Sequence, residues 1–154
     1  MPIEIQEHAF GEYLLSTDIN KLDIRAIHQF LARCDWSKGI PLETVKASIE
    51  HSLNVGLYHK GDQIGFARVI TDYSTIAYLG DVYILEDYQG QKLSTQLMDF
   101  IMKHPYLQGL RRWILLTSTA DWLYAKFGFN KPARPELYME KYTPDIYQKD
   151  IPAD

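Results

Sequence analysis

The chain has 154 residues, of which 46% are hydrophobic and 23% charged, so it is the size and composition of one globular domain. These values exclude a multi-domain, disordered or collagen-like protein. Sixteen basic residues against 20 acidic ones give a net charge of −4, which provides no overall attraction to nucleic acid or anionic lipid.

The first half of the chain predicts one strand and two short helices. Residues 11–17 read as a strand. Asp23 can cap a helix whose apolar residues recur at helical spacing up to Cys34, and Pro41 suits the first turn of a second helix that runs to Leu53. The loop between the two helices, residues 35–39, carries Trp36.

The second half begins with three strands and continues with alternating helices and strands. Residues 54–59, 63–71 and 75–84 are rich in β-branched and aromatic side chains and are separated by short polar turns, which is typical of an antiparallel meander. An amphipathic helix over 93–101, a strand over 112–118, a helix over 119–127 capped by Thr119 and a last strand over 137–142 complete the prediction.

This order predicts an α/β fold with one mixed, mostly antiparallel sheet of about seven strands and helices on both faces. The connection from Ile84 to Trp113 contains a helix, which favours parallel pairing of the two strands that it joins. We expect residues 1–154 to form a single domain, and the sequence leaves the choice between monomer and homodimer open.

Several chemistries lack the residues they need. Cys34 is the only cysteine, and the five histidines show no metal-ligand spacing, so we predict no metal. The first residues lack the pattern of a signal peptide, and no apolar run is long enough to span a bilayer. We therefore expect a cytoplasmic protein without a membrane or nucleic-acid partner.

The segment between residues 83 and 94 joins a predicted strand directly to a helix. Backbone N–H groups at a helix N-terminus form an anion site; Gly90 lets the chain approach a phosphate, while Lys92 and Ser94 add donors. As a pattern alone, this segment is equally an ordinary helix start.

The same segment resembles a known family. Gln89-Gly90-Gln91-Lys92-Leu93-Ser94 is similar to the acyl-CoA pyrophosphate loop of the GNAT N-acetyltransferases, Q/R-x-x-G-x-G/A. Downstream, residues 119–129, ending Tyr124-Ala125-Lys126-Phe127-Gly128-Phe129, resemble the family's late helix, Y-x-K-F-G-F. Residues 137–140 and 144–147 resemble the ending of one small bacterial branch. The resemblance extends to the order of elements over nearly the whole chain.

The loop departs from the family pattern at two positions. Lys92 stands where the family has glycine, and Ser94 replaces the final Gly or Ala. If the glycine position has a positive φ, Lys92 carries strain on the order of 1 kcal/mol, which its ammonium could offset against a CoA phosphate.

The resemblance implies a donor site for acetyl-CoA and a mechanism of direct attack. The loop residues, Gln89 to Ser94, would bind the pyrophosphate, and the backbone of Val82, Tyr83 and Ile84 would pair with the pantetheine arm. The Val82 N–H would face the thioester oxygen. Tyr124 would contact the cofactor near its sulfur and act as general acid, because a phenol is protonated at neutral pH. The alternative is that Tyr124 only packs its helix onto the sheet.

The general base and the acceptor site are less specified. Strand alternation puts Tyr78, Gly80 and Val82 on one face and Leu79 and Asp81 on the other, so Tyr78 has the position and Asp81 the better chemistry, unless a bulge turns it. Asp72 is a third candidate base. The resemblance implies an acceptor site near the loop between the first helices, where Trp36 could form an apolar wall and Asp35 could bind a cationic amine.

The leading hypothesis is therefore an acetyl-CoA-dependent N-acetyltransferase acting on a primary amine of a small molecule or peptide. A non-catalytic acyl-CoA-binding or regulatory module on the same fold is the first alternative, since fold does not settle function. A domain that binds a partner protein through exposed aromatic side chains is the second.

Overall fold

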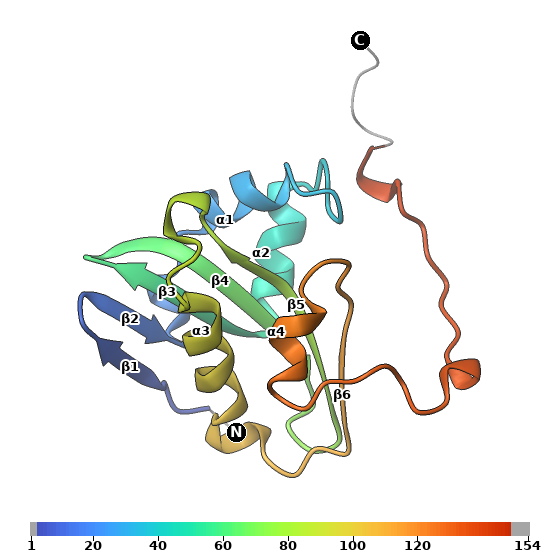
Figure 1. Cartoon of the computed structure of the whole chain (residues 1–154). Helices are drawn as coiled ribbons and strands as arrows, with labels where there is room; N and C mark the ends of the chain where they lie inside the picture. Colours follow the sequence, from blue (N-terminus) through green and yellow to red (C-terminus); the bar gives the residue numbers. More distant parts are fainter. Residues whose placement is uncertain (1–2, 149–154) are drawn as a thin grey trace.

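The computed structural model describes residues 3–148, so the two ends of the predicted domain, 1–2 and 149–154, lie outside the described residues. Its sheet has six strands that follow one another in chain order from β1 to β6 (Figure 1). Every neighbouring pair is antiparallel except β5 and β6, which are parallel. The predicted mixed sheet and its parallel crossover are confirmed.

The strands and helices have the following bounds. The strands are β1 Glu7–Phe10, β2 Tyr13–Ser16, β3 Leu53–His59, β4 Asp62–Thr71, β5 Ile76–Ile84 and β6 Arg112–Leu115. The α-helices are α1 Ile24–Leu31, α2 Leu42–Glu50, α3 Leu93–Met102 and α4 Asp121–Ala125.

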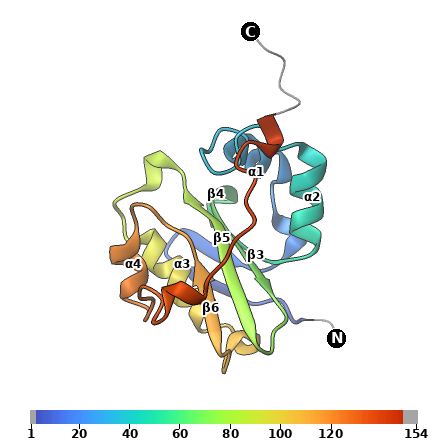
Figure 2. The same cartoon turned by 90° about the vertical axis from the view of Figure 1, so that its right-hand side faces the viewer.

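The helices cover both faces of the sheet and create two cores. Helices α1 and α2 lie on one face, and α3 and α4 lie on the other (Figure 2). Side chains of β4 alternate between the cores, because Phe66 packs with α1 and α2 whereas Ala67 packs with α3. We call the core beneath α3 and α4 the first core and the core beneath α1 and α2 the second core.

Local signals fix the helix starts as the sequence predicts. The Asp23 side chain accepts a hydrogen bond from the Ala26 N–H at 3.0 Å and so caps α1. Pro41 stands at the N-cap position of α2. Helix α4 is the exception: Ala120, and not Thr119, is its N-cap residue, and the Thr117 hydroxyl accepts from the Ala120 N–H instead.

Two strand predictions differ from the structure. The strand predicted over 11–17 is the second arm of a hairpin, because Gly11, with a φ of 56°, turns the chain between β1 and β2. The strand predicted over 137–142 does not form: Pro135–Leu137 is a single 3₁₀ turn, and the residues after it are extended without a strand partner. The described sheet therefore has six strands and not seven, and β6 ends at Leu115.

No helix within residues 3–148 is both long and apolar enough to cross a membrane.

Candidate functional site

A β-bulge decides which side chains of β5 share a face. The register between β4 and β5 shifts between Phe66 and Arg68, and Asp81, opposite this shift, has a φ of 51°. The extra residue moves Asp81 to the face of Tyr78, toward α1 and α2. Val82 packs against the first core together with Leu79, so the predicted pairing of Val82 with Tyr78 on one face is wrong.

The Asp81 carboxylate is the centre of a network that joins three segments. Its Oδ1 accepts from the indole Nε1–H of Trp36 at 3.1 Å, and its Oδ2 accepts from Nε of Arg68 at 2.9 Å. Arg68 also donates from Nη1 to the Ser52 hydroxyl at 3.1 Å. The side chains of Arg68 and Asp81 are only 17% and 13% exposed, so the ion pair is shielded from water and strongly orients both groups.

Arg68 is a site residue that the sequence analysis missed. The signal was present, because a hairpin centred on residues 72–75 brings residue 68 opposite residue 80, next to Asp81. A lone arginine in an otherwise apolar strand needs a partner when it is buried. Trp36 and Tyr78, predicted for the acceptor site, and Asp81, predicted as a candidate base, therefore lie on one face of the sheet, with Arg68 holding the carboxylate.

Of the other groups around Asp81, the Tyr78 phenol and the Cys34 thiol are kept in their neutral forms, and Asp35 is exposed to solvent. Burial raises the pKa of Tyr78, and the negative charge of Asp81 adds to the effect. Burial, followed by the charges of Asp81 and Asp35, raises the pKa of the Cys34 thiol to about 11, so it is not a reactive thiolate at neutral pH. Asp35 itself is exposed, beside the network and not in it.

Strands β5 and β6 pair over only four residue pairs, from Ile76–Arg112 to Leu79–Leu115. Beyond Leu79, β5 continues to Ile84 while the chain after β6 runs in another direction (Figure 1). Val82, Tyr83 and Ile84 therefore lie along an edge that β6 leaves open. The side chains of Tyr83 and Ile84 are buried in the second and first cores, so these residues present their backbone to the opening.

The predicted anion loop has the backbone of an anion site. Gly90 has a φ of 81°, and Lys92 is left-handed, with a φ of 62°, at the N-cap position of α3. No side chain caps this helix, so the first N–H groups of α3 have no partner inside it. Two side chains hold the loop in place. Gln89 Nε2 donates to the Ile84 backbone carbonyl at 3.0 Å, and the side-chain Oε1 of Gln91 accepts from the Tyr13 hydroxyl at 3.0 Å.

Tyr124 lies on α4, on the other face of the sheet from Asp81. Its side chain is 8% exposed and contacts Phe129 edge to face, with ring centroids 6.0 Å apart. Burial raises the pKa of Tyr124, which keeps the phenol protonated. Its hydroxyl has no hydrogen-bond partner among the described residues. It is not one of their fully buried unpaired polar atoms, so it keeps some exposure to solvent.

Asp72, the third candidate base, has a structural task in the described turn. Its carboxylate accepts from the N–H groups of Ser74, Thr75 and Ile76 and from the Thr75 hydroxyl. These hydrogen bonds, of which the one from the Thr75 hydroxyl has the largest effect, hold the pKa of Asp72 well below its usual range. Asp72 also lies at the opposite end of β5 from Asp81.

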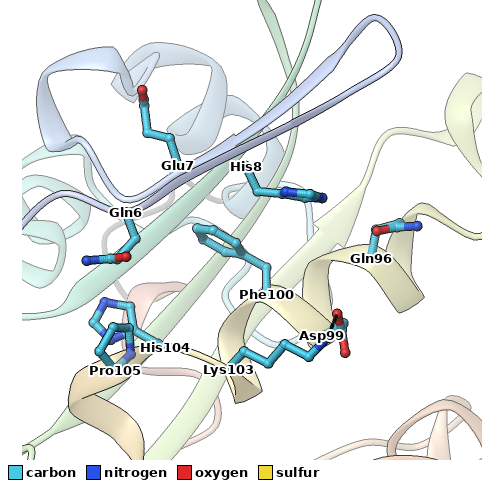
Figure 3. A pocket seen from close by; sticks show the side chains of 9 residues that line it. All are labelled: Gln6, Glu7, His8, Gln96, Asp99, Phe100, Lys103, His104 and Pro105. Carbon is cyan, nitrogen blue, oxygen red and sulfur yellow. Dashed lines mark hydrogen bonds and ion pairs between the residues drawn. The ribbon is translucent and has the colours of Figure 1, made fainter.

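One cavity lies away from all these residues, between β1 and the end of α3 (Figure 3). It has a volume of about 330 Å³, and Phe100 and His104 point into the space below Gln6 and His8. Within residues 3–148, no group of three or more His, Cys, Asp and Glu side chains is arranged to hold a metal ion.

Residues 50–131, from the end of α2 to just beyond α4, match the family model described as the acetyltransferase (GNAT) domain. The chain belongs to the GNAT family of acetyltransferases. This match spans β4, β5, the anion loop and α4, and leaves out the loop that carries Trp36.

Individual GNAT relatives agree with this assignment. A crystal structure of a candidate GNAT-family acetyltransferase from Xanthomonas campestris pv. campestris is 48% identical and has a TM-score of 0.87, over 90% of this chain and 99% of that one. A candidate acetyltransferase of Gibberella zeae is 32% identical over 75% of this chain and 77% of its own length. A candidate acetyltransferase of Clostridium acetobutylicum, solved with acetyl-CoA, shares the fold at 12% identity, with a TM-score of 0.57 over 90% and 96% of the two chains.

Proposed function

We propose that this GNAT protein transfers an acetyl group from acetyl-CoA to a primary amine of a small molecule or peptide. The observation that carries the proposal is the opening where β5 leaves β6. Tyr124 belongs to the first core, which also contains Ile84 and contacts Val82 at this opening, and the Asp81 network stands on the other face of the sheet. A donor and an acceptor could thus approach one reaction point from opposite faces.

The anion loop supports acetyl-CoA as the donor. Unpaired N–H groups at the start of α3 favour a phosphate, and the Lys92 side chain adds a positive charge at the same point. The C. acetobutylicum protein that shares the fold was solved with acetyl-CoA. The backbone of residues 82–84 offers an open strand edge along which an extended pantetheine arm could pair.

In the proposed reaction the amine nitrogen attacks the thioester carbonyl, and the carbon–sulfur bond then breaks. The Val82 N–H stabilises the oxyanion, and one such fixed donor contributes about 3 kcal/mol to the transition state. The departing thiolate takes the proton of the Tyr124 hydroxyl, whose raised pKa keeps that proton available.

The acceptor face supports an amine as the second substrate. Asp81 provides a carboxylate for an ammonium group, Trp36 and Tyr78 provide aromatic faces beside it, and Arg68 fixes the carboxylate. We propose Asp81 as the group that holds the amine and receives its proton, directly or through water, with Tyr78 beside it. Asp35 is exposed and would meet only the outer part of an acceptor.

The test is release of free thiol from acetyl-CoA in the presence of a panel of primary amines. We expect amine-dependent release, and a fall in kcat of about 100-fold or more in Tyr124→Phe, because a general acid contributes about 10²–10⁴-fold. Tyr73→Phe is the matched control, since burial also raises the pKa of that tyrosine but it lies on the β4–β5 turn.

Binding of acetyl-CoA without amine-dependent thiol release across a broad panel would contradict the enzyme proposal. That result would favour the non-catalytic acyl-CoA-binding module. Unchanged kcat in Tyr124→Phe, with amine-dependent release intact, would leave the enzyme in place and assign Tyr124 to packing.

A further inference from the structure

Strand β6 lies at the edge of the sheet but has the composition of a central strand. In the described sheet it pairs with β5 alone. Its residues Trp113, Ile114 and Leu115 are consecutive apolar side chains, and Leu116, directly after it, is 76% exposed. Proteins normally cover or charge such an edge, because its unpaired N–H and C=O groups attract another strand.

The segment after α4, residues 130–148, which we call the arm, is unpaired in the same region. It leaves the body beyond α4 and passes in front of β6 and β5 toward α1 (Figures 1 and 2). Its side chains Leu137, Met139 and Tyr142 are 59%, 97% and 67% exposed. Within the described chain, the backbone groups of 139–142 make no hydrogen bond to other backbone groups.

The arm is anchored at both ends, and its middle is not paired with any strand of the described chain. At its start, the Phe129 N–H donates to the Tyr124 carbonyl at 3.2 Å, and the Phe129 ring contacts Trp113. Near its end, Tyr147 packs against the second core. The middle is held beside β6 without pairing, because the Arg112 guanidinium lies 5.8 Å from the centre of the Tyr138 ring.

A cavity of about 590 Å³ separates the middle of the arm from β6. Arg112 and Ile114 line it from the strand, and Leu137, Tyr138 and Met139 line it from the arm. A single chain thus contains an apolar strand edge, an apolar extended segment and an unfilled space between them.

We propose that this face is the interface of a homodimer in which residues 139–142 of each chain add as an antiparallel strand to the β6 edge of the other. Residues 139–142 match the length of β6, Arg112–Leu115. Within this segment, Glu140 is opposite in charge to Arg111 and Arg112 at the edge, and the neighbouring Lys141 would face the other side of an extended strand.

A second copy fits this face better than an unrelated protein does. In a dimer with a two-fold axis, the arm of each chain pairs with the β6 edge of the other. Both arms and both edges then gain a partner at once, as a self-complementary interface requires. Main-chain hydrogen bonds supply the affinity in this kind of strand addition, and the alternating side chains of the arm fill the pockets.

The first experiment measures mass in solution by light scattering after size-exclusion chromatography. We expect twice the 17.9 kDa mass of one chain. Met139→Pro should raise the dimer dissociation constant at least 10-fold, because proline cannot donate to a strand neighbour. Met139→Ala is the matched control: it keeps the N–H and should still dimerise. Since Met139 is 97% exposed, neither substitution should disturb the fold of a single chain.

The second experiment identifies the occupant of the β6 edge by cross-linking. With Cys34→Ala as background, a chain carrying Met139→Cys is mixed with one carrying Ile114→Cys under mild oxidation. We expect a disulfide-linked pair of chains, and none when Lys46→Cys on α2 replaces Ile114→Cys.

Three results would overturn the proposal. The first is a monomer at all accessible concentrations. The second is a dimer that Met139→Pro leaves unchanged. The third is a cross-link that forms only inside a chain carrying both Met139→Cys and Ile114→Cys, which would mean that the arm folds back onto its own β6.

Discussion

Asp81 is the residue on which the proposed acceptor site depends. Both of its oxygens accept hydrogen bonds, one from Trp36 and one from Arg68, and an asparagine would keep an acceptor for only one of these donors and would remove the negative charge. We predict that Asp81→Asn lowers kcat/KM for cationic amines by about 10-fold or more, since 1.4 kcal/mol of lost interaction is tenfold. The acetyl-CoA dissociation constant should stay unchanged.

The measurement is a pair of titrations, one of amine in the thiol-release assay and one of acetyl-CoA by calorimetry. Asp99→Asn is the control, because Asp99 pairs with Lys103 on the surface of α3. A parallel weakening of both substrates in Asp81→Asn would show that the change disturbs the fold and not the acceptor site.

The position of Asp81 also marks the limit of sequence reasoning at this scale. The residue types around the acceptor could be predicted, and Trp36, Tyr78 and Asp81 do meet. The face of the sheet on which each side chain lies could not be predicted, because one extra residue in a strand inverts the alternation for every residue after it. Arg68 was missed for a related reason, since its role comes from the residue opposite it in the next strand.

At the scale of elements, the junction of the anion loop with α3 combines two opposing effects in Lys92. A lysine with a φ of 62° costs about 1 kcal/mol relative to glycine, while its ammonium would add a positive charge to the proposed phosphate site. We predict that Lys92→Gly raises the melting temperature of the free protein by about 2–4 °C and weakens acetyl-CoA binding.

Lys92→Ala separates the two effects, because alanine keeps the backbone strain and removes only the charge. It should weaken acetyl-CoA binding as Lys92→Gly does, without the gain in melting temperature. Thermal melts and calorimetric titration of all three proteins check this. A melting temperature that is equal in Lys92→Gly and Lys92→Ala would contradict the assignment of strain to this position.

Periodicity predicted elements well wherever a partner strand exists. Strands β3, β4 and β5 and helices α1 to α3 have the expected places because burial on one face imposes the alternation that the sequence shows. Residues 137–142 are also rich in apolar and aromatic side chains but have no strand neighbour among residues 3–148, and composition alone cannot report whether a neighbour is present. Strand β1 was missed because three of its four residues are exposed and leave no such pattern.

At the scale of the whole molecule, stability should depend on pH through His104. This side chain is 3% exposed; its Nδ1 accepts from the Tyr106 N–H, and its Nε2 has no partner within residues 3–148. Burial lowers the pKa of His104 below its ordinary value of 6.5. Near pH 6.5 His104 therefore binds a proton in the unfolded chain but not in the folded chain. The free energy of unfolding falls as the pH drops below that value.

The check is the melting temperature measured from about pH 7.5 down to about pH 5.5. His104→Asn keeps an acceptor for the Tyr106 N–H and removes the titration, so its melting temperature should fall less steeply over this range. His51→Asn, at an exposed histidine on the C-terminal end of α2, should leave the slope close to that of the parent. Equal slopes in the parent and His104→Asn would refute the prediction.

The architecture itself was predictable because two motifs and the order of elements agree with one family. The opening between β5 and β6 was expected only through that resemblance, since no residue pattern in either strand marks where their pairing ends. Four residue pairs hold them together, after which β5 continues to Ile84 and the chain leaves β6 toward α4.

That short parallel pairing has a consequence for the order in which the chain folds. The meander from β3 to β5 is closed by turns of a few residues, whereas β6 reaches β5 only after the whole of α3 has been passed, which makes its loop-closure entropy larger. We therefore expect β6, α4 and the phenol of Tyr124 to join the structure after the meander. The proposed acid would then belong to a later-formed part of the protein than the carboxylate opposite it, which lies in the meander.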